Sequence, residues 1–138
     1  MNRINSTSVT YRRYHTIARH WASDIDFFKI EMVFLHHLLD DYFLRLSAPE
    51  YIEGLKSVGR KLLQLEKDKY SADVHLMEHL KHLEGQTEDL VFDHFEFLAA
   101  NHEGMENQMI HLTTTYRMLK QELFLQIQEV IKAQQEGV

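Results

Sequence analysis

Apolar side chains recur every three or four residues along most of the chain, and this spacing limits the fold more than any other feature. Residues with this spacing share one face of an α-helix, and the pattern is typical of helices that pack side by side at a small crossing angle. The first segment, His15 to Leu46, therefore predicts a long helix. Its apolar repeat consists of Trp21, Ile25, Phe28, Met32, Leu35, Leu39, Tyr42 and Leu46.

The second helical segment covers residues 50–84 and follows the sequence Ser47-Ala48-Pro49. Ser47 can cap a helix, and Pro49 suits the first turn, where its missing N–H costs nothing. The centre of the segment, residues 66–73, is polar. We therefore expect one helix of about 35 residues with a weak or kinked centre, or two helices if it breaks near Ser71.

The third segment begins after Gly85, where Thr87 can cap a new helix, and its apolar repeat continues to Val130. A helix of about 45 residues would be roughly 70 Å long and would extend past the two shorter ones. Residues 119–131 would then form an apolar overhang, which we expect to pack against a partner chain or the N-terminal arm.

One proline and five glycines are too few for an all-β fold, which needs a turn every ten residues or so. The sequence predicts an all-α, antiparallel bundle of three long helices with coiled-coil-like packing, or four if the second helix breaks near Ser71. We expect a single domain over residues 1–138, in which residues 1–13 form a flexible basic arm. Short connections make neighbouring helices antiparallel.

Charges are unevenly distributed, although the formal net charge of −6 makes nucleic acid an improbable main partner. In the predicted bundle, the basic N-terminal region and the acidic start of the third helix lie at the same end, so we expect them to match each other. The alternative is an arm that binds an anionic membrane or partner. The basic residues are Arg3, Arg12, Arg13 and Arg19; the acidic ones include Glu88, Asp89, Asp93 and Glu96.

The chain has no cysteine, which excludes disulfides, Fe–S clusters and thiol catalysis and fits a reducing compartment. No apolar run is long enough for a transmembrane helix. The first fifteen residues lack the apolar core of a secretory signal, although they loosely resemble an organelle transit peptide. We therefore expect a cytoplasmic protein.

Ten histidines are the one unusual compositional feature. Residues four apart share a helix face, so such histidine and carboxylate pairs can converge on a metal inside a bundle. The pairs are His75 with His79, His102 with Glu106, and His37 with Asp41. His102 lies on the apolar repeat, where a histidine needs a buried partner. In contrast, His75 and His79 are expected to flank the stripe of Leu76, Leu80 and Leu83.

Counting residues back from each predicted turn places four histidines in one layer of the bundle: His20, His75, His79 and His94. The HxxxH and HxxxE pairs, His75/His79 and His102/Glu106, resemble those of the hemerythrin family, whose members are four-helix bundles with a non-haem di-iron centre. The resemblance implies a metal held by these residues. In that family HxxxE precedes HxxxH, whereas the order here is reversed.

Motifs for other chemistries are missing, because the sequence contains no GxGxxG, P-loop, GxSxG or HExxH pattern. We therefore expect a non-enzymatic bundle without a cofactor that acts through protein–protein contact, with self-association through the C-terminal part of the third helix. The alternative is a bundle that binds iron, zinc or another transition metal. Its candidate ligands are His75, His79, His102, Glu106, His20 and His94. Binding of an anionic surface and histidine pH sensing are further possibilities.

Overall fold

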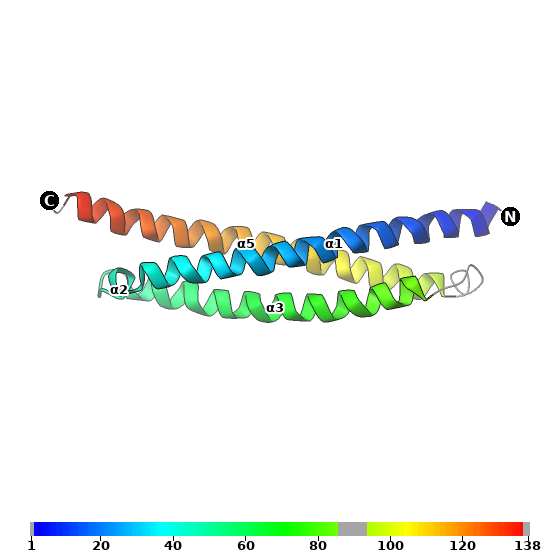
Figure 1. Cartoon of the computed structure of the whole chain (residues 1–138), viewed down its shortest axis with the longest axis horizontal. Coiled ribbons are helices and arrows are strands. Elements are labelled where there is room, and N and C mark those ends of the chain that lie inside the picture. The colour runs from blue at the N-terminus through cyan, green and yellow to red at the C-terminus, as the bar shows by residue number, and fades with distance from the viewer. Residues whose placement is uncertain (1, 86–93, 137–138) are drawn as a thin grey trace. The chain divides into compact units, whose positions relative to one another are not determined.

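The protein is an all-α chain in the computed structural model, which describes residues 2–85 and 94–136 and, for residues 2–7, only the backbone. No β-strand occurs in the described residues, and three long helices are present, as predicted. Figure 1 shows a short fourth element, α2, at the turn between α1 and α3. In the described residues the helices are α1 (Asn2–Asp41), α2 (Phe43–Leu46), α3 (Ile52–Glu84) and α5 (Phe95–Glu136).

The second helix is continuous, so the four-helix alternative with a break near Ser71 was wrong. Lys69 and Asp73, within the polar centre, stand where a strict heptad repeat would place apolar residues. Instead Ala72 is fully buried and continues the apolar face between Leu65 and Leu76. The buried face of α3 therefore continues through the polar stretch at Ala72, and not at Lys69 or Asp73.

The N-terminal region is helical from Asn2, and the predicted flexibility of an arm over residues 1–13 stays a prediction. Residues 2–41 contain neither proline nor glycine, so nothing in this stretch interrupts a helix. Contacts also hold it in place: the Tyr11 hydroxyl donates a hydrogen bond to the Leu83 carbonyl of α3, and Ala18 is fully buried.

The turn between α1 and α3 differs in detail from the prediction. The first long helix ends at Asp41, and α2 forms one further turn that ends at the fully buried Leu46. The Ser47 hydroxyl donates to the Leu44 carbonyl at 2.8 Å, so it closes α2 and does not cap the next helix. The predicted start of the third helix near Thr87 lies outside the described residues.

Contacts divide the chain into two compact units. Unit 1 comprises Met1–Phe27 and Lys69–His111, and unit 2 comprises Phe28–Asp68 and Leu112–Val138. Each unit therefore contains one part of α1, one of α3 and one of α5. The single-domain prediction over residues 1–138 stays a prediction.

In unit 2, α3 runs antiparallel to α5, because Gly54 contacts Gln126 while Lys61 contacts Glu122. The Nε2 atom of Gln126 donates to the Gly54 carbonyl at 3.3 Å, and a Cβ atom at Gly54 would come within 2.9 Å of it. The core consists of apolar side chains from all three helices. They include Phe28, Met32, Leu35, Val58, Leu62, Leu65, Leu112, Leu119 and Leu123.

The C-terminal part of α5 is not an apolar overhang, which corrects the premise of the predicted self-association. Leu119, Leu123, Ile127 and Val130 are all buried in the chain itself. The Glu122 side chain also accepts hydrogen bonds from α3, including one from the Lys61 Nζ atom at 2.8 Å. This face of α5 is therefore already covered within unit 2.

In unit 1, the core again combines residues of α1, α3 and α5. Its apolar members include Ala18, Ile25, Ala72, Leu76, Leu83, Leu98, Met105 and Met109. Two histidines, His79 and His102, are buried among them, and they are the buried polar side chains of the part of the chain that the structure describes.

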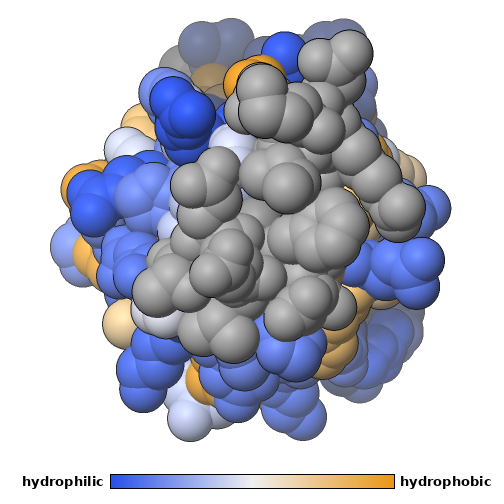
Figure 2. All heavy atoms as spheres, turned by 90° about the vertical axis from the view of Figure 1, so that its right-hand side faces the viewer, coloured by the Kyte–Doolittle hydropathy of each residue, from blue (hydrophilic) through white to orange (hydrophobic). Residues whose placement is uncertain are grey.

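None of the described helices combines the length and apolarity needed to cross a membrane. Figure 2 views the side on which the N-terminal end of α1 lies. Outside the grey residues, the surface visible there is mostly hydrophilic, with small hydrophobic areas separated by hydrophilic residues.

Candidate functional site: a buried histidine pair

His79 and His102 face each other inside unit 1. His79 comes from α3 and His102 from α5, and the Nε2 atom of His79 lies 3.3 Å from the Nδ1 atom of His102. Their exposed fractions are 2% and 5%. A buried polar group needs a hydrogen-bond partner, and each imidazole supplies one to the other. The prediction that His102 needs a buried partner is thus confirmed.

Two aromatic rings of α1 cover His102. The Tyr14 ring stacks on it with a centroid distance of 4.0 Å and an angle of 17° between the planes. The Trp21 ring stacks at 4.6 Å and 30°. All three helical segments of unit 1 therefore meet at the His102 imidazole.

The hydrogen-bond pattern determines which ring nitrogen carries hydrogen. The Nδ1 atom of His79 is buried and has no hydrogen-bond partner among the described residues. If the hydrogen of His79 were on Nδ1, the protein would bury an N–H donor without a bond, and such donors are rarer in proteins than buried acceptors without a bond. We therefore assign it to Nε2, which donates to the Nδ1 atom of His102. The hydrogen of His102 is then on its own Nε2 atom.

Both imidazoles are held in the neutral form. Burial lowers the pKa of His79 to about 4, and positive charge on His102 or His82 would lower it further in the same direction. Burial also lowers the pKa of His102, although the negative charge of Glu106 opposes this change. The physical cause is that an imidazolium loses its hydration when it is buried. At neutral pH the pair is therefore uncharged.

A cavity of about 410 Å³ lies next to the pair, between α3 and α5. His75 lines this cavity, and its Nδ1 atom lies 3.1 Å from the Oε1 atom of Gln108. At another part of the wall, the rings of His82 and Phe97 meet edge to face, with a centroid distance of 5.3 Å. The remaining lining residues include Glu78, His79, Ala100, Asn101, Gly104 and Met105.

Comparison with known proteins assigns no family to the chain. No protein-family model, curated protein or solved structure matches it. Its function is therefore inferred from the contacts and the exposure of its own residues.

The six candidate metal ligands do not converge. The structure brings His79 and His102 together, and His75 lines the neighbouring cavity but pairs with Gln108. His20 is exposed on α1, and His94 is exposed at a smaller cavity of about 210 Å³. Across residues 2–85 and 94–136, no group of three or more histidines or carboxylates is placed to hold a metal. Metal binding stays a prediction without support from this geometry.

His79 was expected to flank the apolar stripe of α3, and this expectation was wrong. It lies on the buried face, which runs through Ala72, Leu76 and Leu83 with spacings of four, three and four, whereas Leu80 is partly exposed. A stripe drawn through leucines alone missed this register. The alanine at position 72 was the signal that could have placed His79 in the core.

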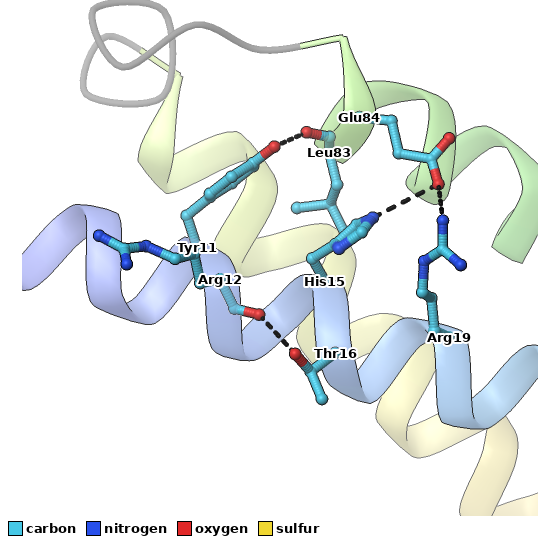
Figure 3. Close-up of polar contacts among 7 residues, drawn as sticks. All are labelled: Tyr11, Arg12, His15, Thr16, Arg19, Leu83 and Glu84. Atoms are coloured by element: carbon cyan, nitrogen blue, oxygen red, sulfur yellow. Dashed lines mark hydrogen bonds and ion pairs between the residues drawn. The ribbon is translucent and has the colours of Figure 1, made fainter.

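The basic N-terminal region meets an acidic residue of α3. As Figure 3 shows, His15 and Arg19 both point toward the Glu84 carboxylate, at 3.3 and 3.4 Å. Arg19 and Glu84 are well exposed, so this ion pair contributes little to stability. Arg12 and Arg13 are exposed as well. Three of their predicted partners, Glu88, Asp89 and Asp93, lie outside the described residues.

Proposed function

We propose that the protein acts without catalysis, through protein–protein contact, and that its first partner is a second copy of the same chain. The observation that supports this proposal is an apolar strip on the outer face of α1 in unit 2. The strip consists of Ile30, Val33 and Phe34, whose exposed fractions are 70%, 54% and 47%.

The strip lies opposite the buried face of the same helix. At 100° per residue, its three members project away from the side that carries Phe28 and Leu35. Single exposed apolar side chains are common on proteins, but neighbours on one helix face form a continuous area. Contact with another apolar surface removes such an area from water, and this lowers the free energy of the associated state.

A second copy of the chain is a suitable partner for this strip, because two uncharged apolar surfaces can pack together without complementary charges. None of the three side chains is charged, so the strip offers no basis for selecting an acidic or basic partner. A two-fold contact places the same patch on both chains, and an uncharged apolar helix face is complementary to itself. The contact would pack Ile30 and Phe34 of one copy against the same residues of the other.

The proposed site of self-association differs from the one predicted from the sequence. The sequence placed it on the apolar repeat of the C-terminal part of α5, but that face is buried in unit 2. On its outer face α5 exposes Met118 and Leu125, which lie seven residues apart. They provide a smaller secondary contact. The cytoplasmic location stays a prediction.

The test compares the molar mass of full-length variants by light scattering. The double substitution Ile30→Glu and Phe34→Glu places two like charges in the proposed contact, and we expect it to produce a monomer with unchanged helical content. Tyr70→Glu is the matched control, because Tyr70 is 71% exposed on α3 of unit 1. A double variant that associates as strongly as the Tyr70→Glu variant would contradict the proposal.

A further inference from the structure

We propose that the His79–His102 pair is an acid-sensitive joint between α3 and α5 of unit 1, which is closed at neutral pH and opens when the pair binds one more proton. Protonation changes the number of hydrogens that the two rings carry. Two neutral imidazoles carry two N–H hydrogens on four ring nitrogens, and an added proton makes three.

While the His79–His102 hydrogen bond stays intact, the added proton always leaves a hydrogen on Nδ1 of His79. The His79–His102 hydrogen bond needs one nitrogen without hydrogen as its acceptor, either Nδ1 of His102 or Nε2 of His79. In both cases the other three nitrogens carry hydrogen, and Nδ1 of His79 is always one of them. That atom is buried and has no partner among the described residues. Protonation with the bond intact therefore buries both a charge and an unbonded N–H.

The charges near the two histidines have opposite effects on protonation. The Glu106 charge favours the protonated form of His102, and the stacked rings of Tyr14 and Trp21 can also accept a cation against their faces. In contrast, His82 disfavours a charge on His79, in addition to burial. The added proton is thus best held by His102, and His79 has to give up the bond.

Other titratable groups surround the pair on each helix. His79 lines the same cavity as His75, Glu78 and His82. His102 lines a separate cavity with Tyr14, Glu96, Glu103 and Glu106. Of these carboxylates, Glu106 lies one turn further along α5, and its negative charge favours the protonated form of His102. The cavity of about 410 Å³ beside His79 gives the released imidazole space to turn toward water.

The joint therefore separates α3 from α5 locally, while His102 keeps its stacking contacts with α1. The lowered pKa values of both histidines agree with this mechanism, because they place protonation below the range of exposed imidazoles. Opening would expose to water the side chains that α3 and α5 bury against each other here, among them His79 and Met105.

Hydrogen exchange at pH 7.5 and pH 5, corrected for the intrinsic effect of pH, tests the joint in the full-length protein. In the wild type, we expect protection of residues 72–84 and 95–108 to fall by roughly tenfold or more at pH 5. Residues 112–130 of unit 2 should change less.

The variant His79→Gln separates the joint from a general effect of acid. The glutamine amide reaches about as far as Nε2 of histidine, does not titrate, and can donate or accept after a flip. It therefore bonds either form of His102, and we expect the acid-dependent loss of protection to be clearly smaller than in the wild type. His20→Gln is the control, because His20 is an exposed histidine of unit 1. Equal acid-dependent losses in wild type and His79→Gln would overturn the proposal.

A measurement on the wild type makes the test independent of how well the variant folds. Nitrogen-15 NMR of the imidazoles reports which ring nitrogen carries hydrogen. We expect His79 to be the Nε2–H form at pH 7.5 and to take up a proton only well below its ordinary pKa. An Nδ1–H form, or protonation of His79 near its ordinary pKa of 6.5, would overturn the proposal.

Discussion

The Nε2 atom of His79 lies 3.3 Å from the Nδ1 atom of His102, and this contact joins α3 to α5 inside unit 1. It belongs to two side chains that are almost completely buried. Because an imidazole loses hydration when it is buried, the folded protein binds a proton less readily than the unfolded chain. Stability must therefore depend on pH.

The first prediction concerns the pH dependence of unfolding. Burial lowers the pKa of His79 to about 4, whereas its ordinary value is 6.5. The unfolded chain thus binds the proton first as pH falls, so the stability is full above pH 6.5 and is lost between pH 6.5 and 4. We expect a loss of about 2 kcal/mol between pH 7.5 and 5 from this residue alone, measured by urea unfolding. The His79→Gln variant should show a smaller loss, and an equal one would contradict the prediction.

The second prediction concerns Tyr116, whose hydroxyl donates to the Glu31 carboxylate in unit 2. Burial, followed by the hydrogen bond and the charge of Glu31, raises the pKa of Tyr116 well above its ordinary value. Tyr116→Phe keeps the ring contact with Phe28 but removes this bond, so we expect it to lower the free energy of unfolding by about 1–2 kcal/mol.

Lys120→Met is the control for Tyr116→Phe. It removes the longer and more exposed contact with Glu31, in which the Nζ atom lies 3.5 Å from the carboxylate. We expect a change below about 1 kcal/mol. Urea unfolding at one pH compares the two variants. A larger effect for Lys120→Met would show that the Tyr116–Glu31 hydrogen bond contributes little to the free energy of unfolding.

The third prediction uses two glycines of α3. A Cβ atom at Gly59 meets nothing within 4 Å, whereas one at Gly54 comes within 2.9 Å of the Gln126 amide. Gly59→Ala should raise the free energy of unfolding by about 0.5–1 kcal/mol, because alanine favours the helix. Gly54→Ala should give no such gain, since it displaces the amide that donates to the Gly54 carbonyl. Equal stabilisation in thermal unfolding would contradict this account.

The fourth prediction concerns the C-terminal part of α5. Leu123 is buried and Leu125 is 54% exposed, although they are only two residues apart. Leu123→Ala should cost about 2–5 kcal/mol through the cavity that it leaves, and Leu125→Ala should change stability by less than about 0.5 kcal/mol. Similar effects of the two substitutions on urea unfolding would mean that this face of α5 is not packed within the chain.

The helices were predictable because apolar residues recur with the helical spacing many times along each of them. Residues such as Ile25, Leu62 and Leu112 follow the period of a helix, and each is buried where the period places it. The helix over residues 2–13 was less predictable, since this stretch carries few apolar residues, and the Tyr11 side chain bonds to Leu83, which is far away in the sequence. Tertiary contacts of this kind leave no local pattern.

The histidine pair was only half predictable. His102 lies on the apolar repeat, so its burial followed from the sequence. His79 follows a face on which Ala72 takes the place of a large side chain, and the leucine stripe suggested another register. The stacking of Tyr14 and Trp21 on His102 joins segments about eighty residues apart. Counting from the turns cannot resolve contacts between single side chains over that separation.

The most direct test of the central claim, self-association through α1, is the molar mass of the unmodified chain over a dilution series. One chain has a mass of 16.5 kDa. In sedimentation equilibrium from low to high micromolar concentration, we predict a mass that rises toward twice this value and falls again on dilution. A mass of 16.5 kDa at every concentration would contradict the account.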